Sequence, residues 1–300
     1  MAENITESVE LKQKKRVRIG YIFLGLVPFA IIMAVQTAAT IPGVILAVVD
    51  VVRSGRSYEL ATIMEIFNSK YALAVYTAYC VICLAIFLPW YCKGIVKKNP
   101  KVIYKKALGL RPVALSVSAM ICMFFVVSGG FVVFSRLLPA IMEKYNELIE
   151  LSSVGTNTLI TIIYVILLGP LTEELCYRGL MFGLMERSNA NHLVIITIQG
   201  VLFGIMHMNV VQGAYAFLLG VLLGYLRYRY KTVIITVGVH MLFNIIGTYG
   251  AQLLEKAGMN DDMSLLFGGI ALAVLAVLMI PVIKDKNVYT RERESGKVIS

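Results

Sequence analysis

Long apolar runs dominate the chain, and each is about as long as a helix that crosses a lipid bilayer. Apolar residues make up 58% of the 300 positions, whereas soluble domains contain about 45–50%. A helix needs roughly 20 apolar residues to span the hydrocarbon core. The sequence therefore predicts an all-α polytopic membrane helix bundle of about eight transmembrane helices. These spans are expected at 19–52, 71–92, 113–135, 158–185, 192–208, 212–229, 233–252 and 264–283.

Lysines and arginines flank the apolar runs unevenly, and this asymmetry predicts the orientation of the chain. Of the 28 residues of these two types, 21 lie in segments 1–18, 93–111, 186–191, 227–231 and 284–300. With eight spans, these five segments share one side, which the positive-inside rule makes the cytosolic side. Both termini are therefore expected in the cytosol, with a polar segment 1–18 and a tail 284–300 on either side of a transmembrane domain 19–283.

The net charge of +10 follows from this topology. The basic residues lie where lipid headgroups are expected and are not interleaved with aromatic residues on a polar face. We therefore expect membrane lipid, and no nucleic acid, as a partner. The basic segment 93–111 is either an amphipathic stretch in the membrane interface or a solvated loop.

Prolines and cysteines in the first spans are interpreted as structural. Pro28 and Pro42 predict a kinked or broken helix, and 53–70 is expected to be a short polar loop. Cys80 and Cys83 form a C-x-x-C motif with no second pair nearby. This isolation favours hydrophobic packing over redox or metal chemistry.

Three ionisable residues interrupt the span 158–185. Glu173, Glu174 and Arg178 would each cost roughly 2.5–3.5 kcal/mol at the bilayer centre, so they are expected to face protein or water and to serve a function. Glu174 and Arg178 are four residues apart and can pair on one helix face. Glu173 lies about 100° away around the helix and is free for other work. Pro170, just before them, predicts a kink and a freed carbonyl.

Two later spans place histidines at a similar depth. His207 ends the sequence QGVLFGIMH with Phe203 one turn before it, and His240 precedes Asn244 by one turn. With a rise of about 1.5 Å per residue, Glu173 and these three polar residues fall roughly 12–22 Å from the inner ends of their helices, in one mid-membrane slab. We interpret the four as a functional site; the alternative is that they are helix–helix hydrogen-bond donors.

Glycine pairs on three neighbouring spans predict close helix packing around this slab. The pairs are Gly179–Gly183, Gly200–Gly204 and Gly220–Gly224. GxxxG pairs let backbones approach closely in lipid. The pattern alone does not distinguish a functional site from ordinary packing.

These polar side chains suit the hydrolysis of an amide bond. A carboxylate in a low-dielectric site can act as general base on a water molecule, with a neighbouring histidine holding the water or moving its proton. A second histidine and an amide can donate hydrogen bonds to the oxyanion. No GxSxG or HExxH motif is present, which argues against covalent serine catalysis and a zincin helix.

Three short motifs resemble those of a known family. They are EELCYR at 173–178, FGIMH at 203–207 and HMLFN at 240–244. These resemble the EExxxR, FxxxH and HxxxN/D motifs of the CPBP intramembrane proteases, which include CAAX proteases and bacteriocin-processing enzymes and are also called the Abi family. The order and separation match over about 160–250, the motif core.

The resemblance implies a membrane-embedded endopeptidase. It implies that Glu173 activates water with His207, and that His240 and Asn244 stabilise the oxyanion, while Glu174 and Arg178 support the site. Family members are described both as metalloproteases and as metal-free glutamate-dependent enzymes. If zinc is bound here, its expected ligands are Glu173, His207 and His240. We favour a metal-free reaction.

The chain is more similar to bacterial members of this family, which implies the bacterial cytoplasmic membrane as its location. Those members are associated with peptide or bacteriocin maturation, self-immunity or control of surface proteins, so a membrane-associated protein or peptide is the expected substrate. Two alternatives stay open. One is a non-catalytic scaffold or bacteriocin-immunity protein that keeps the fold, and the other is a proton-coupled transporter that uses the same carboxylates.

Overall fold

A computed structural model describes residues 17–96, 108–151 and 159–284, and every regular element in these ranges is helical. The elements are α2 (Ile19–Ser54), α3 (Leu60–Ile66), η1 (Phe67–Tyr71), α4 (Ala72–Gly94), α6 (Leu110–Leu137), α7 (Pro139–Leu151), η3 (Ile160–Leu168), α8 (Gly169–Glu174), η4 (Leu175–Met181), α9 (Phe182–Met185), η5 (Glu186–Ser188), α10 (His192–Met206), α11 (Val210–Tyr230), α12 (Val233–Ile245), η6 (Ile246–Gly250), α13 (Ala251–Lys256) and α14 (Asp261–Lys284). The predicted all-α class is confirmed.

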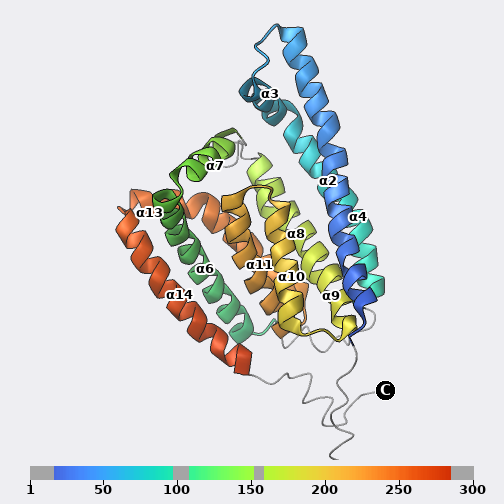
Figure 1. Cartoon of the computed structure of the whole chain (residues 1–300), viewed down its shortest axis with the longest axis vertical. Coiled ribbons are helices and arrows are strands. Elements are labelled where there is room, and N and C mark those ends of the chain that lie inside the picture. The colour runs from blue at the N-terminus through green and yellow to red at the C-terminus, as the bar shows by residue number, and fades with distance from the viewer. Residues whose placement is uncertain (1–16, 97–107, 152–158, 285–300) are drawn as a thin grey trace, which may run out of the picture.

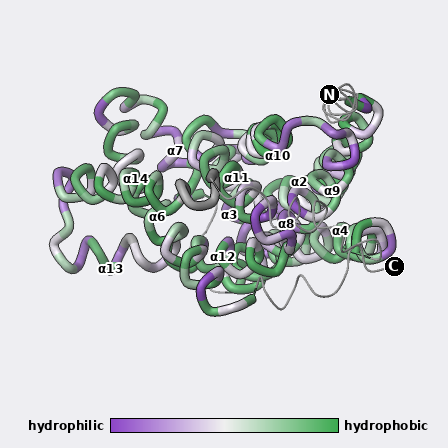
Figure 2. The backbone as a smooth tube through the Cα atoms, turned by 90° about the horizontal axis from the view of Figure 1, so that it is seen from below, coloured by the Kyte–Doolittle hydropathy of each residue, from purple (hydrophilic) through white to green (hydrophobic). Residues whose placement is uncertain are grey.

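Seven helices within the described ranges are long and apolar enough to cross a membrane. The protein is therefore an integral membrane protein. The predicted span 192–208 forms α10, which has 15 residues and is about 22 Å long, shorter than a hydrocarbon core of about 30 Å. The eight predicted spans are thus seven full-length helices and one short helix. Hydrophobic residues cover most of their length (Figure 2).

The helices form a bundle with one projecting edge (Figure 1). Helices α2 and α4, joined through α3, extend beyond the other helices at one end, and α6 and α14 form the opposite edge. Helices α8 to α11 lie between these two edges. The described chain begins in α2 and ends in α14 at the same end of the bundle, as an even number of passes requires. The assignment of that end to the cytosol stays a prediction.

Glycines bring α10 and α11 into backbone contact. A Cβ atom added to Gly204 would lie 2.6 Å from the Gly213 carbonyl oxygen, and one added to Gly220 would lie 2.9 Å from Gly200 Cα. The predicted close packing therefore holds for these two helices. On the third predicted pair, Gly179 contacts the Tyr91 ring of α4, so that glycine makes room for a side chain.

Two connecting regions contain more helix than the sequence suggested. The expected polar loop 53–70 includes α3, because Ile63 and Ile66 pack on apolar residues of α2. Helix α7 follows α6 directly, in a region where no helix was predicted. Helix α2 is continuous through Pro28 and Pro42, so the prolines do not break it.

Some predictions concern residues outside the described ranges. These are most of the polar segment 1–18, the middle of the basic segment 93–111 and almost all of the tail 284–300.

Candidate active site

The helix that carries the two glutamates alternates between π-helical and α-helical spacing. Its π-helical segments η3 and η4 lie on either side of the α-helical turn α8. π-helical hydrogen bonds join residues five apart, and such segments are frequent at functional sites. The glutamates end α8, near the middle of the span Ile160–Ser188. The glutamates therefore lie near the middle of a helix long and apolar enough to cross a membrane.

Pro170 leaves one main-chain carbonyl of this helix free, as predicted. The Gly169 N–H donates to the Tyr164 oxygen, five residues back. With the same five-residue spacing, the next hydrogen bond would join the N–H of residue 170 to the Val165 carbonyl. Residue 170 is a proline and has no N–H, so this bond cannot form. Instead, Asn244 Nδ2 of α12 donates to the Val165 oxygen at 2.7 Å. The amide of Asn244 thus satisfies the carbonyl that the proline cannot.

Glu174 is the centre of a buried charge network. Its Oε1 accepts a hydrogen bond of 2.8 Å from Arg178 Nη1 and lies 3.0 Å from His240 Nδ1. Glu174 and Arg178 are fully buried and His240 is 3% exposed. The predicted pair between residues 174 and 178 is confirmed. Because an ionised carboxylate only accepts hydrogen bonds, Nδ1 of His240 carries a proton.

Glu173 lies on a different side of the helix from this pair. Its Oε2 faces His240 Nε2 at 3.8 Å, and its side chain is 13% exposed. The imidazole of His240 therefore stands between the two carboxylates, with one nitrogen toward each. This arrangement agrees with the prediction that Glu173 is separate from the ion pair.

Phe203 joins the second histidine to this network. Its buried ring has edge contacts with the rings of His207 and His240, at centroid distances of 5.2 and 5.7 Å. The guanidinium of Arg178 lies 4.5 Å from the centroid of the same ring. His207 Nδ1 lies 2.8 Å from the Phe203 carbonyl oxygen, so it donates there and leaves Nε2 as an acceptor in the neutral ring.

The structure thus gathers six of the predicted residues into one cluster: Glu173, Glu174, Arg178, Phe203, His207 and His240. Asn244 lies one turn beyond His240 and commits one N–H to Val165. Its second N–H is not used in that contact.

The expected metal ligands are not arranged as a metal site. Among the described residues, no three His, Cys, Asp or Glu side chains are grouped closely enough to hold a metal ion. Of the three expected zinc ligands, Glu173 and His240 face each other at 3.8 Å, and the His207 ring packs against Phe203. The residues therefore do not fit a three-ligand zinc site in this arrangement.

Two other polar residues near the cluster, Gln199 and Arg227, were not predicted from the sequence. Gln199 Nε2 and Arg178 Nη2 both donate to the Gly220 carbonyl, at 2.7 and 3.1 Å. Arg227 Nε donates to the Arg178 carbonyl at 2.9 Å. A search for every polar residue inside an apolar span would have found Gln199. Arg227 ends its span, where cations are usually interpreted as interface anchors.

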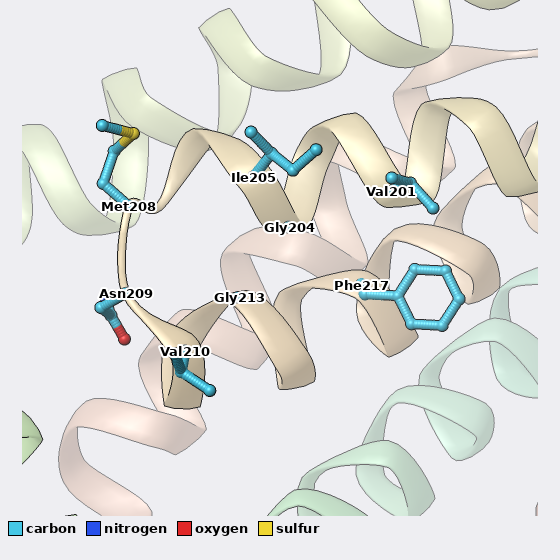
Figure 3. Close-up of a pocket in the computed structure, with 8 residues that line it drawn as sticks. All are labelled: Val201, Gly204, Ile205, Met208, Asn209, Val210, Gly213 and Phe217. Carbon is cyan, nitrogen blue, oxygen red and sulfur yellow. The ribbon is translucent and has the colours of Figure 1, made fainter. Parts of the chain in front are cut away.

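An apolar groove opens where α10 turns into α11 (Figure 3). It has a volume of about 430 Å³ and is lined by Val201, Gly204, Ile205, Met208, Asn209, Val210, Gly213 and Phe217. Met208 is 79% exposed and has a φ of 58°, which is uncommon outside glycine. Asn209 is held within the turn by hydrogen bonds to His207 and Gln212. The groove therefore offers a hydrocarbon surface at the α10–α11 turn, and one of its lining residues, Met208, follows His207 in the sequence.

The comparison with protein families gives one match. Residues 155–246 match a family described as Rce1-like, type II CAAX prenyl endopeptidase Rce1-like. The matched stretch contains all three motifs noted in the sequence. The comparison with curated proteins and that with solved structures give no match.

Proposed function

Since residues 155–246 are an Rce1-like domain of the CPBP and CAAX protease family, we propose that this protein is an intramembrane endopeptidase. It hydrolyses a peptide bond of a membrane-associated protein or peptide with a water molecule activated by glutamate and histidine. The observation that carries the proposal is the Glu173 carboxylate facing His240 Nε2 at 3.8 Å, inside a membrane span. A partly exposed carboxylate beside a buried charge network suits general-base work.

In this mechanism Glu173 removes a proton from the attacking water. His207 Nε2 holds that water, because Nδ1 is fixed on the Phe203 carbonyl. The proton on Glu173 then passes to the nitrogen of the leaving amine as the peptide bond breaks. Orientation of the water and the carboxylate is the contribution of the fold.

Charge on the tetrahedral intermediate is balanced by His240. A cationic His240 can donate from Nε2 to the oxyanion while Nδ1 stays on Glu174. Arg178 neutralises Glu174, whose Oε1 is shared between Arg178 Nη1 and His240 Nδ1. The second N–H of Asn244 is the remaining candidate donor to the oxyanion.

The substrate is proposed to approach from the lipid. The groove at the α10–α11 turn has an apolar lining and lies where these two helices meet. It suits the hydrocarbon part of a lipid-anchored or membrane-inserted substrate. We propose the bacterial cytoplasmic membrane as the location, with membrane lipid and a membrane-associated protein or peptide as partners. Bacteriocin maturation or immunity is the family-level context.

The deciding experiment compares membrane proteomes of cells that carry the wild type and Glu173→Gln. The change is nearly isosteric and removes only the general base. A precursor should accumulate in the variant, and its cleavage should be restored by the wild type alone. A variant that keeps both the cellular phenotype and the full set of cleaved products would show that the protein is a scaffold or immunity protein.

A further inference from the structure

The helix Ile160–Ser188, which carries both glutamates and is called the site helix below, is held at Arg178 by two hydrogen bonds with α11. Arg178 Nη2 donates to the Gly220 carbonyl, and Arg227 Nε donates to the Arg178 carbonyl. Gly220 and Arg227 lie two turns apart on α11. The same residue of the site helix is thus fixed by its side chain and by its main chain.

The Arg178 carbonyl lies where the helix leaves π-helical spacing. The Phe182 N–H donates to the Gly179 and Tyr177 oxygens, three and five residues back, and the Arg178 carbonyl lies between these two acceptors in the sequence. A return from π-helical to α-helical spacing leaves one carbonyl without its helical donor. Arg227 supplies a donor there, as Asn244 does for Val165 at the other π-helical segment.

Arg227 also reaches the end of the site helix. Its guanidinium is 2% exposed, with Nη2 3.9 Å from Glu186 Oε2 and its central carbon 5.5 Å from the Phe182 ring centroid. Among the described residues, Arg227 Nη1 has no hydrogen-bond partner. The buried cation therefore relies on Glu186 for its counter-charge. Lys231 Nζ holds the same carboxylate at 2.8 Å.

We propose that Arg227, with Glu186 as its counter-charge, is a positioning residue of the active site. It contacts two points on the site helix, the Arg178 carbonyl within segment Leu175–Met181 and the Glu186 carboxylate about two turns later, and so fixes the end of that segment. Through Arg178 this segment sets the position of Glu174, and through Glu174 that of the His240 imidazole. The catalytic part of this inference rests on the proposed function, whereas the structural part does not.

Amide hydrogen exchange of the full chain in lipid nanodiscs tests the structural part. In Arg227→Met, which keeps the side-chain volume, loss of a charge-assisted hydrogen bond should raise exchange of segment 175–181 by about tenfold. Exchange in α14, which packs mainly on α6 at the far edge of the bundle, should stay as in the wild type. Arg229→Met is the matched control on the same helix and should leave segment 175–181 protected.

Two results would overturn the positioning role. One is unchanged exchange of segment 175–181 in Arg227→Met. The other is a rise of equal size in α14, which would assign Arg227 to general stability. Arg227→Lys should restore little of the exchange protection of segment 175–181, because a lysine ammonium lacks the planar guanidinium that reaches both Arg178 and Glu186.

The catalytic part is tested by peptidase kinetics of the same variants. Misplacement of the site should lower kcat by about tenfold or more with KM nearly constant, since the groove is untouched. A change in KM alone would contradict it. Absence of peptidase activity in the wild type would instead reject the proposed function and leave the exchange result to decide the structural role.

Discussion

The side-chain amide of Asn244 donates a hydrogen bond of 2.7 Å to the Val165 carbonyl, the acceptor that Pro170 leaves free. A motif residue of α12 is thereby attached to the helix that carries the glutamates. Because His240 lies one turn before Asn244 on α12, this bond also holds the His240 imidazole at the level of Glu174. The proline and the asparagine therefore act as a pair.

The pairing predicts non-additive stability changes. Asn244→Leu should destabilise the protein by about 1–3 kcal/mol, because the Val165 carbonyl loses its donor. Pro170→Ala supplies an N–H that can donate to the Val165 carbonyl. In the double variant with Asn244→Leu, it should therefore recover part of the lost stability. Thermal unfolding of all four proteins in detergent measures the coupling, and strictly additive changes would contradict it.

The buried pair of Glu174 and Arg178 predicts a large loss on breaking it. Arg178→Met leaves the Glu174 carboxylate buried without its main cation, which should cost about 3–5 kcal/mol. The exposed pair of Arg56 and Glu65 is the matched control, with an ion-pair distance of 2.6 Å. Arg56→Met should change stability by less than about 1 kcal/mol. The measurement is again the thermal unfolding midpoint, and equal shifts for the two variants would refute the prediction.

Much of the site could be predicted because residues four apart share a helix face. That spacing identified the pair of Glu174 and Arg178 and separated Glu173 from it. It could not show that His240 Nδ1 meets Glu174, because π-helical turns add a residue and rotate the helix faces. Arg227 was missed because a cation at the end of a span is expected to face headgroups.

The short helices were harder to predict than the spans. Helix α3 is recognisable only when Ile66 is seen to pack on Ala47 and Val51 of α2, a contact between residues distant in sequence. Helix α10 has only 15 residues because the chain turns at Met208. No sequence pattern predicted the positive φ of Met208.

The backbone contact between α10 and α11 predicts opposite results for two glycine substitutions. A methyl group on Gly204 would meet the Gly213 carbonyl, so Gly204→Ala should destabilise by about 1–3 kcal/mol and move the groove walls apart. Gly238 of α12 has open space around its Cβ position. Gly238→Ala should therefore stabilise by about 0.5–1 kcal/mol. A stabilising Gly204→Ala would show that the crossing is looser than described.

The arrangement of the expected zinc ligands predicts how the peptidase responds to chelation. A zinc site needs three or four ligands around one point, and no such group exists among the described residues. Activity should therefore survive a membrane-permeant chelator at concentrations that inactivate a zinc protease added to the same membranes. Glu173→Gln should lower the rate by about 10²–10⁴-fold, because it removes the general base. Loss of activity with chelator and its recovery with zinc would contradict the metal-free reaction.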